Sequence, residues 1–158
     1  DFKILEATEY INKKQKVILV DEIEKYFGGN IEGKKIAMWG LAFKANTDDI
    51  REASSLDNIE LLLEKGAQVV AYDAIAEENV RKILGDKIEY SKDMYSALEG
   101  ADCLLIATEW SEFKNPNFEL MASKLKNKVI FDGRNMFSME QAEGSGFFYK
   151  SIGRKTVR

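Results

Sequence analysis

Residues 34–52 read KKIAMWGLAFKANTDDIRE, a short apolar run that ends at a glycine and continues into a long polar loop. Ile36–Trp39 has the continuous apolar character of a buried strand, and no helical pattern resumes before about residue 54. Loops at strand ends collect binding groups because the scaffold beneath them holds those groups in place. We therefore expect a buried strand that leads into a candidate binding loop.

This loop lacks the glycine pattern of dinucleotide-binding folds. After Gly40, no second or third glycine follows at the G-x-G-x-x-G spacing, so a pyrophosphate could not bind this turn in the standard way. The loop offers instead the ring of Phe43 beside the cation of Lys44, with Arg51 further on, and this combination suits a nucleotide or a sugar phosphate. Spacing alone leaves an alternative open, in which Phe43 packs in the core and the charges are solvated.

Apolar runs and helical patterns alternate along the rest of the chain. Strands are expected at 36–39, 68–72, 87–90, 102–107, 129–131 and 147–149, and helices at 54–65, 77–84, 94–98, 118–125 and 139–144. Ser54 and Asp57 have a spacing that predicts a side-chain cap at the start of the first of these helices. The alternation predicts an α/β, doubly wound (Rossmann-like), mostly parallel six-stranded sheet with helices on both faces and strand order 3-2-1-4-5-6.

An N-terminal helical segment precedes this alternation. Residues 2–27 carry apolar positions among Glu and Lys without a proline or glycine, which predicts one helix or two segments that meet near Asn12. Gly28-Gly29-Asn30 then ends the helical pattern. We therefore divide the chain into a helical lead-in at residues 1–30 and an α/β domain at residues 31–158.

Composition excludes several classes of function. The chain has 158 residues, 45% of them hydrophobic, so we expect one domain with a hydrophobic core. Its net charge of -4 leaves no basic surface stripe of the kind that binds nucleic acid or an anionic membrane. No apolar run is long enough to span a bilayer and no signal-peptide pattern is present, so a cytoplasmic protein is expected. Without histidine, His-based acid-base chemistry and His metal sites are excluded. The only cysteine, Cys103, lies in a strand pattern and is expected to be a packed thiol.

Three loops are expected to share one edge of the sheet. In a doubly wound sheet, ligands bind at the carboxyl ends of the strands, near the point where the first and fourth strands part. These loops are residues 40–52, 108–110 and 132–135. The third carries Arg134, whose forked guanidinium suits phosphate or carboxylate, so Lys44 and Arg134 should lie on the same edge.

Three acidic or aromatic positions at strand ends allow two interpretations each. Asp73 ends the second strand, where a dinucleotide fold places an acid to hold a ribose, but without the glycine fingerprint a structural role is favoured. Glu109 and Trp110 either line the ligand cleft or close the loop after the fourth strand. The sequence does not decide their roles.

Four motifs together resemble one enzyme family. They are GLAFKANTDDIREASS at 40–55, YDA at 72–74, ATEWSEF at 107–113 and FDGRN at 131–135. In order and spacing they resemble the C-terminal, UDP-binding domain of the UDP-glucose/GDP-mannose dehydrogenase family, and are most similar to its UDP-glucose 6-dehydrogenase branch. The resemblance covers essentially the whole chain and implies that residues 1–30 are the end of the central helical region of a longer enzyme.

The resemblance also implies roles for individual residues. Phe43, Lys44 and Arg134 correspond to positions that contact the nucleotide sugar. Arg51 corresponds to an arginine that reaches the NAD pyrophosphate across the domain interface. An ion pair of Arg51 with Asp48 or Asp49 is the alternative, and for that residue the sequence leaves both open.

In the resembled family, the full enzyme oxidises UDP-glucose to UDP-glucuronate with two NAD through a cysteine-bound intermediate, and a homodimer is expected. This chain lacks the NAD fingerprint and the nucleophilic cysteine motif, because Cys103 lies in a different context. We therefore expect no catalytic residue and no metal site in it, and no activity of the chain alone. The alternatives are a dehydrogenase of GDP-mannose or UDP-N-acetylmannosamine, a compact NAD-dependent oxidoreductase that acts alone, and a non-catalytic interaction module.

Overall fold

In the computed structural model, which describes residues 2–158, six strands form one sheet in the order β3-β2-β1-β4-β5-β6, and all neighbouring strands are parallel. The strands are β1 Lys35–Trp39, β2 Gln68–Tyr72, β3 Glu89–Tyr90, β4 Cys103–Ile106, β5 Val129–Asp132 and β6 Phe148–Ser151. The central strand β1 pairs through Ile36 with Val69 of β2 and with Cys103 of β4. The predicted fold class and strand order are confirmed. Residue 1 of the expected lead-in lies outside the described residues.

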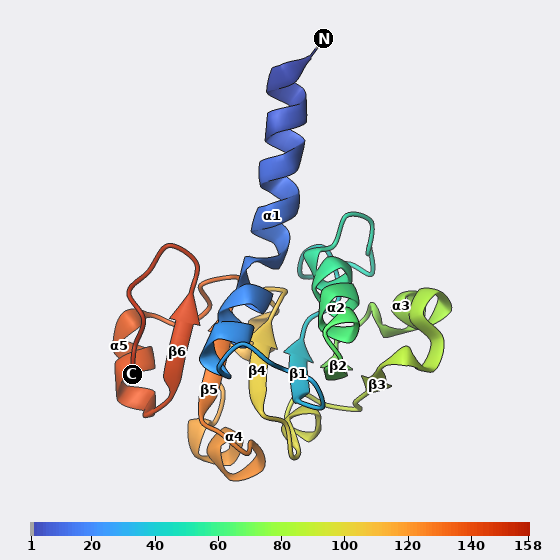
Figure 1. Cartoon of the computed structure of the whole chain (residues 1–158). Helices are drawn as coiled ribbons and strands as arrows, with labels where there is room; N and C mark the ends of the chain where they lie inside the picture. The colour runs from blue at the N-terminus through green and yellow to red at the C-terminus, as the bar shows by residue number, and fades with distance from the viewer. Residues whose placement is uncertain (1) are drawn as a thin grey trace.

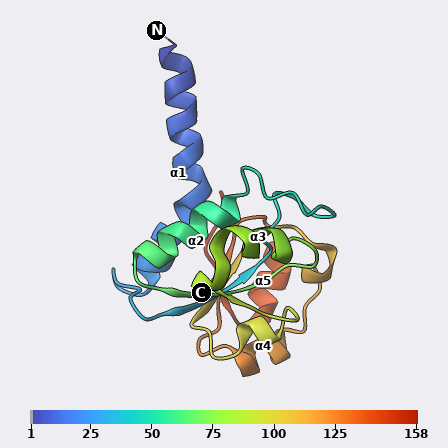
Figure 2. The same ribbon diagram turned by 90° about the vertical axis from the view of Figure 1, so that its right-hand side faces the viewer.

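Helices cover both faces of this sheet, as predicted. They are α1 Lys3–Tyr26, α2 Ser54–Glu64, α3 Glu77–Leu84, α4 Phe118–Lys124 and α5 Met139–Ser145. Figure 2 shows α1 and α2 on one face of the sheet and α4 and α5 on the other. Short 3-10 turns at Gly85–Lys87, Ser96–Leu98 and Ser111–Phe113 complete the connections.

Of the two alternatives for the N-terminal segment, α1 is the single helix, with no break at Asn12. Two local predictions differ from the structure. The helix expected at 94–98 is only the turn Ser96–Leu98, because the backbone leaves the helical conformation at Glu99, whose ψ is 110°, and Gly100 follows with φ +67°. The cap expected from Ser54 is absent, since α2 begins after Ala53 without a side-chain cap.

The core lies along β1 and β4. Ile36–Trp39 is fully buried, and Trp39 stacks on Phe113 with ring centroids 4.9 Å apart. The indole of Trp39 donates to Met94 O at 2.8 Å, so this large ring is buried with its polar atom satisfied. Cys103 is a free, buried cysteine, and burial raises the pKa of its thiol, as expected for a packed and unreactive side chain.

The N-terminal half of α1 stands away from the rest of the molecule (Figure 1). Every residue from Phe2 to Gln15 is exposed, and only the lower part of the helix is anchored. The buried anchor residues are Leu19, Val20 and Ile23. The exposed large apolar residues of the projecting half are Phe2, Ile4, Leu5, Tyr10 and Ile11. None of the helices within residues 2–158 combines the length and the apolar character needed to cross a membrane.

Candidate functional site

An open cavity of about 900 Å³ lies between the middle of α1 and the carboxyl ends of the central strands. Its floor comes from β4 and from the loops that follow β1 and β5, and its opposite wall comes from one face of α1. The residues of the floor include Phe43, Ala107, Gly133 and Arg134, and those of the helical wall include Asn12, Lys16 and Leu19. The cavity thus lies where ligands bind in doubly wound sheets.

The loop after β1 begins with a turn that only glycine can make. Gly40 has φ +93°, and a Cβ there would lie 2.4 Å from Cβ of Thr108. The carbonyls that follow are then bound by hydroxyls, with Ser55 Oγ 2.5 Å from Leu41 O and Thr108 Oγ1 2.6 Å from Ala42 O. Ser55 therefore fixes the loop from the side of α2, and Thr108 fixes it from the end of β4.

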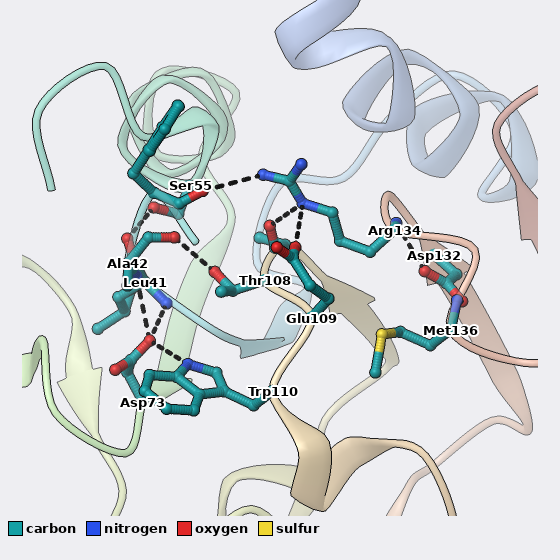
Figure 3. Close-up of polar contacts among 12 residues, drawn as sticks. Leu41, Ala42, Ser55, Asp73, Thr108, Glu109, Trp110, Asp132, Arg134 and Met136 are labelled. Atoms are coloured by element: carbon teal, nitrogen blue, oxygen red, sulfur yellow. Dashed lines mark hydrogen bonds and ion pairs between the residues drawn. The ribbon is translucent and has the colours of Figure 1, made fainter. Parts of the chain in front are cut away.

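The N–H groups of the same turn bind a buried carboxylate (Figure 3). Asp73, which follows β2 and is 4% exposed, accepts the N–H of Leu41 at 2.6 Å and that of Ala42 at 3.0 Å through its Oδ2. The indole Nε1 of Trp110 donates to the same oxygen at 3.0 Å. Oδ1 accepts two further N–H groups from the turn after β2. Asp73 thus joins the loops that follow three strands.

Arg134 is fixed at the end of β5 by its backbone and its side chain. Its N–H donates to the fully buried carboxylate of Asp132 at 2.8 Å. Its Nε donates to Ala107 O at 2.7 Å and lies 3.3 Å from Oε2 of Glu109, and its Nη2 is 3.5 Å from Phe43 O. Within residues 2–158, Nη1 has no hydrogen-bond partner. The guanidinium is therefore oriented by the protein while one of its nitrogens is left for another partner.

Glu109 and Trp110, whose roles the sequence left open, are both parts of this framework. Figure 3 shows Glu109 directed towards Arg134 and Trp110 directed towards Asp73. Trp110 is 5% exposed, so its ring closes the loop instead of lining the cavity. Asp73 is a structural carboxylate, as the missing glycine fingerprint indicated, although its contacts with the loop after β1 were not predicted.

Phe43 and Arg134 lie together, whereas Lys44 does not line the cavity. Phe43 is 46% exposed, so the alternative that its ring belongs to the core is wrong. Lys44 is exposed and makes no hydrogen bond or ion pair with any residue of the described chain. Its charge helps, as the smallest of several causes, to lower the pKa of Asp49.

Arg51 lies apart from the cavity and is paired locally. Its Nε and Nη2 bind the carboxylate of Asp49, and 87% of the side chain is exposed. Of the two acids considered from the sequence, the partner is Asp49, because Asp48 is bound by the amide of Asn79. The Arg51 guanidinium lowers the pKa of Asp49 to about 2.

The polar wall on α1 was missed by the sequence analysis, which treated this segment only as a lead-in. Lys16 lies 2.8 Å from Glu52 and 3.3 Å from Asp57, and the hydrogen bond with Glu52 raises the pKa of Lys16. The amide of Asn58 donates to Lys16 O and so ties α1 to α2. The polar spacing of Asn12 and Lys16, four residues apart, was the available signal for a polar helix face.

The described residues offer no metal centre. Within residues 2–158, no group of three or more cysteine or acidic side chains is arranged to hold a metal ion.

The chain is similar to nucleotide-sugar dehydrogenases. The sequence model described as UDP-glucose/GDP-mannose dehydrogenase family, UDP binding domain, matches residues 37–139. The UDP-glucose 6-dehydrogenase TuaD of Bacillus subtilis is 45% identical over 157 residues, which are 99% of this chain and 34% of that protein. The chain thus spans about a third of the length of the curated relatives it matches.

Two solved structures resemble the whole fold. The UDP-glucose dehydrogenase of the archaeon Pyrobaculum islandicum has a TM-score of 0.71 and 32% identity, covering 93% of this chain and 30% of that one. The UDP-D-ManNAc dehydrogenase of Pyrococcus horikoshii has a TM-score of 0.75 and 27% identity, covering 98% of this chain and 34% of that one.

Proposed function

Because this chain belongs to the UDP-glucose/GDP-mannose dehydrogenase family, whose UDP binding domain matches most of it, we propose that the cavity beside α1 binds the UDP part of a nucleotide sugar. The observation that carries this proposal is the meeting of Phe43 and Arg134 at the cavity, from loops 91 residues apart in sequence. A flat ring and an oriented guanidinium on one edge of a parallel sheet suit a nucleotide and its phosphates.

Phe43, Lys44 and Arg134, the three proposed substrate-binding residues, have distinct roles, and only Phe43 and Arg134 line the cavity. Arg134 has its guanidinium held through Nε, which leaves Nη1 to donate a charge-assisted hydrogen bond to a phosphate or sugar oxygen. Phe43 presents a half-exposed ring against which a base or sugar can pack. Lys44 adds an unpaired cation to the same loop, which attracts the phosphate charge.

We propose that the longer protein is a UDP-glucose 6-dehydrogenase, which oxidises UDP-glucose to UDP-glucuronate with two NAD. In this proposal, residues 1–30 end the central helical region and residues 31–158 form the nucleotide-sugar domain. NAD binds mainly to an N-terminal domain, and Arg51 reaches its pyrophosphate from across the interface. Catalytic residues lie outside this chain, which carries neither a glycine fingerprint nor a reactive cysteine.

The projecting half of α1 supports the proposal of further domains. Its apolar side chains, among them Ile4 at 83% and Leu5 at 63% exposure, would be covered by the remaining parts of the same enzyme. We propose a cytoplasmic homodimer without nucleic-acid or membrane partners. Light scattering on the longer enzyme measures its mass in solution, and a monomer at micromolar concentration would contradict the dimer.

Which sugar the nucleotide-sugar substrate carries is a separate proposal. Similarity to the UDP-D-ManNAc dehydrogenase of Pyrococcus horikoshii favours UDP-N-acetylmannosamine as the alternative substrate. GDP-mannose is the other alternative substrate in this family. The alternative without catalysis is that the chain is an interaction module that binds no nucleotide sugar. Kinetics with each nucleotide sugar on the longer enzyme would rank the substrates.

Calorimetric titration of the 158-residue chain with UDP tests the binding proposal directly. We expect saturable binding of UDP at one site, weaker binding of uridine because it lacks the phosphates, and weaker binding of GDP because its base is larger. A chain that releases no binding heat with UDP while its circular dichroism shows a folded protein would contradict the proposal.

A further inference from the structure

In a dinucleotide-binding fold, the backbone N–H groups of the turn after the first strand bind the ligand. In this chain the corresponding N–H groups, after β1, bind a side chain of the protein itself. In that fold the turn leads directly into a helix, and its N–H groups face the pyrophosphate. Here α2 begins only at Ser54, and the N–H groups of Leu41 and Ala42 face Oδ2 of Asp73. A carboxylate of the protein itself therefore occupies the place of an anionic ligand.

Every acceptor position of Asp73 is used. Oδ2 accepts from two backbone N–H groups and from Trp110, and Oδ1 accepts from the N–H groups of Ile75 and Ala76 at 2.9 and 2.8 Å. Asp73 makes no ion pair within residues 2–158, and it is 4% exposed. Five N–H donors thus stabilise the buried carboxylate by hydrogen bonds, and this stabilisation lasts only while the donors stay in place.

These contacts determine where Phe43 and Lys44 project. The carbonyls of Leu41 and Ala42 are fixed by hydroxyls, and their N–H groups are fixed by Asp73, so both sides of the peptide chain are held up to residue 42. Phe43, the next residue, points its own carbonyl at Arg134. Asp73 therefore fixes the backbone as far as Ala42, and Phe43, a proposed UDP-binding residue, follows directly in the chain.

We propose that Asp73 is a positioning residue for nucleotide-sugar binding: its carboxylate substitutes for a ligand phosphate at the turn after β1 and so fixes Phe43 and Lys44 in their binding orientation. This inference rests on the proposed function, because UDP is the ligand whose affinity it concerns. Asparagine cannot replace Asp73, since its NH2 group would face N–H donors and at least two of the five would lose their acceptor.

The first experiment compares Asp73→Asn with Asp102→Asn by UDP calorimetry and thermal unfolding. Asp102 is a matched control because it is also buried, at 5% exposure, and accepts a backbone N–H from Lys35, but it lies at the amino ends of the strands. We expect both variants to unfold at lower temperature. Only Asp73→Asn should weaken UDP binding, by roughly tenfold, because it alone disturbs the binding loop.

A spectroscopic readout separates positioning from general destabilisation. In the proton–nitrogen NMR spectrum, the indole N–H of Trp110 and the amides of Leu41 and Ala42 should shift in Asp73→Asn and stay unchanged in Asp102→Asn. Unchanged signals in Asp73→Asn would overturn the inference even if the affinity fell.

Chemical rescue gives an independent test. Asp73→Ala removes the carboxylate and leaves space for a small one, so millimolar formate should restore part of the UDP affinity and return the Trp110 indole signal towards its original position. Formate should not improve UDP binding by the unchanged chain or by Asp73→Asn, whose site is filled. No rescue in a folded Asp73→Ala chain would count against the inference.

The two proposals fail in different ways. An unchanged chain that does not bind UDP overturns the proposed function and this inference with it. A chain that binds UDP, and whose Asp73→Asn variant binds it equally well, overturns only the role of Asp73.

Discussion

Arg51 and Asp49 form a two-point ion pair on the surface, with Nε of Arg51 2.9 Å from Oδ1 and Nη2 2.7 Å from Oδ2 of Asp49. The pair aligns the guanidinium without burying it, since 87% of the Arg51 side chain is exposed. Among the described residues, Nη1 of Arg51 has no hydrogen-bond partner, so local pairing with Asp49 and a contact with NAD are compatible.

Arg51→Ala should raise the Michaelis constant for NAD in the longer enzyme and leave the unfolding temperature of this chain nearly unchanged, because exposed ion pairs contribute little to stability. The matched control is Arg81→Ala, which removes an exposed arginine paired with Glu77 on α3. Steady-state kinetics and thermal unfolding of both variants provide the measurement. If Arg51→Ala lowers the unfolding temperature by several degrees without affecting NAD kinetics, Arg51 is structural.

Asp49 should titrate well below an ordinary aspartate. Its pKa is lowered from 3.8 to about 2, chiefly by the hydrogen bond from the Arg51 side chain. Because the folded-state pKa is lowered, the contribution of this pair to stability is present above pH 3.8 and is lost as pH falls through about 2. Carbon NMR of the Asp49 carboxyl group measures the midpoint, which Arg51→Ala should return towards 3.8. A midpoint near 3.8 in the unchanged chain would contradict the pairing.

Arg134→Ala should weaken UDP binding by about 1.5–3 kcal/mol, the usual value of a hydrogen bond to a charged group, while the chain stays folded. Arg154→Ala is the control, because Arg154 also donates to a backbone carbonyl, that of Phe137, but does not line the cavity. Lys44→Ala should weaken UDP binding as well. Calorimetry at two salt concentrations measures these effects, and unchanged affinity in both Arg134→Ala and Lys44→Ala would show that the site is misplaced.

Gly40→Ala should destabilise the chain more than Gly28→Ala. Both glycines have positive φ, at +93° and +78°, so each alanine carries backbone strain of about 1–3 kcal/mol. Only at Gly40 would the new Cβ also meet Thr108, at 2.4 Å, whereas nothing lies within 4 Å at Gly28. Chemical denaturation of the two variants gives the difference, and equal losses would show that the turn after β1 can move away from Thr108.

The 158-residue chain alone should not oxidise UDP-glucose with NAD. Its sequence contains no glycine fingerprint, and its one cysteine is buried with a raised thiol pKa, so neither a hydride acceptor site nor a nucleophile is present. Absorbance of NADH is the measurement. NADH formation that scales with the concentration of the purified chain would contradict this prediction.

The centre of the sheet could be predicted from the sequence because Ile36–Trp39, Cys103–Ile106 and Val129–Phe131 are uninterrupted apolar runs. Gln68–Tyr72 and Glu77–Leu84 have the predicted bounds, and the strand order follows from right-handed crossovers. Short elements were less predictable. The segment at 94–98 was expected to be a helix, but the backbone turns out of the helical conformation at Glu99 and Gly100, which leaves only a 3-10 turn.

The residues on the floor of the cavity could be predicted from the sequence, whereas those on its α1 wall could not. Phe43 and Arg134 follow strands at the carboxyl edge, so topology alone brings their loops together. Asp73 was also recognised as a strand-end acid, but its partners are backbone N–H groups, which every residue carries and no motif reveals. The wall on α1 depends on the direction in which that helix crosses the sheet. The hydrophobic periodicity of the sequence predicts that the segment is helical, but it does not predict this direction.

α1 has an exposed N-terminal part, the arm, which ends at Gln15, and a packed C-terminal part, the root, which begins at Lys16. A helix rises about 1.5 Å per residue, so the arm from Gln15 to Lys3 reaches about 18 Å beyond the root. A tilt of roughly 5° at the root would move the tip by about 1.5 Å. Because Lys16 and Leu19 line the cavity at the root, any tilt of α1 there would displace the exposed apolar residues of the arm further than the residues at the cavity.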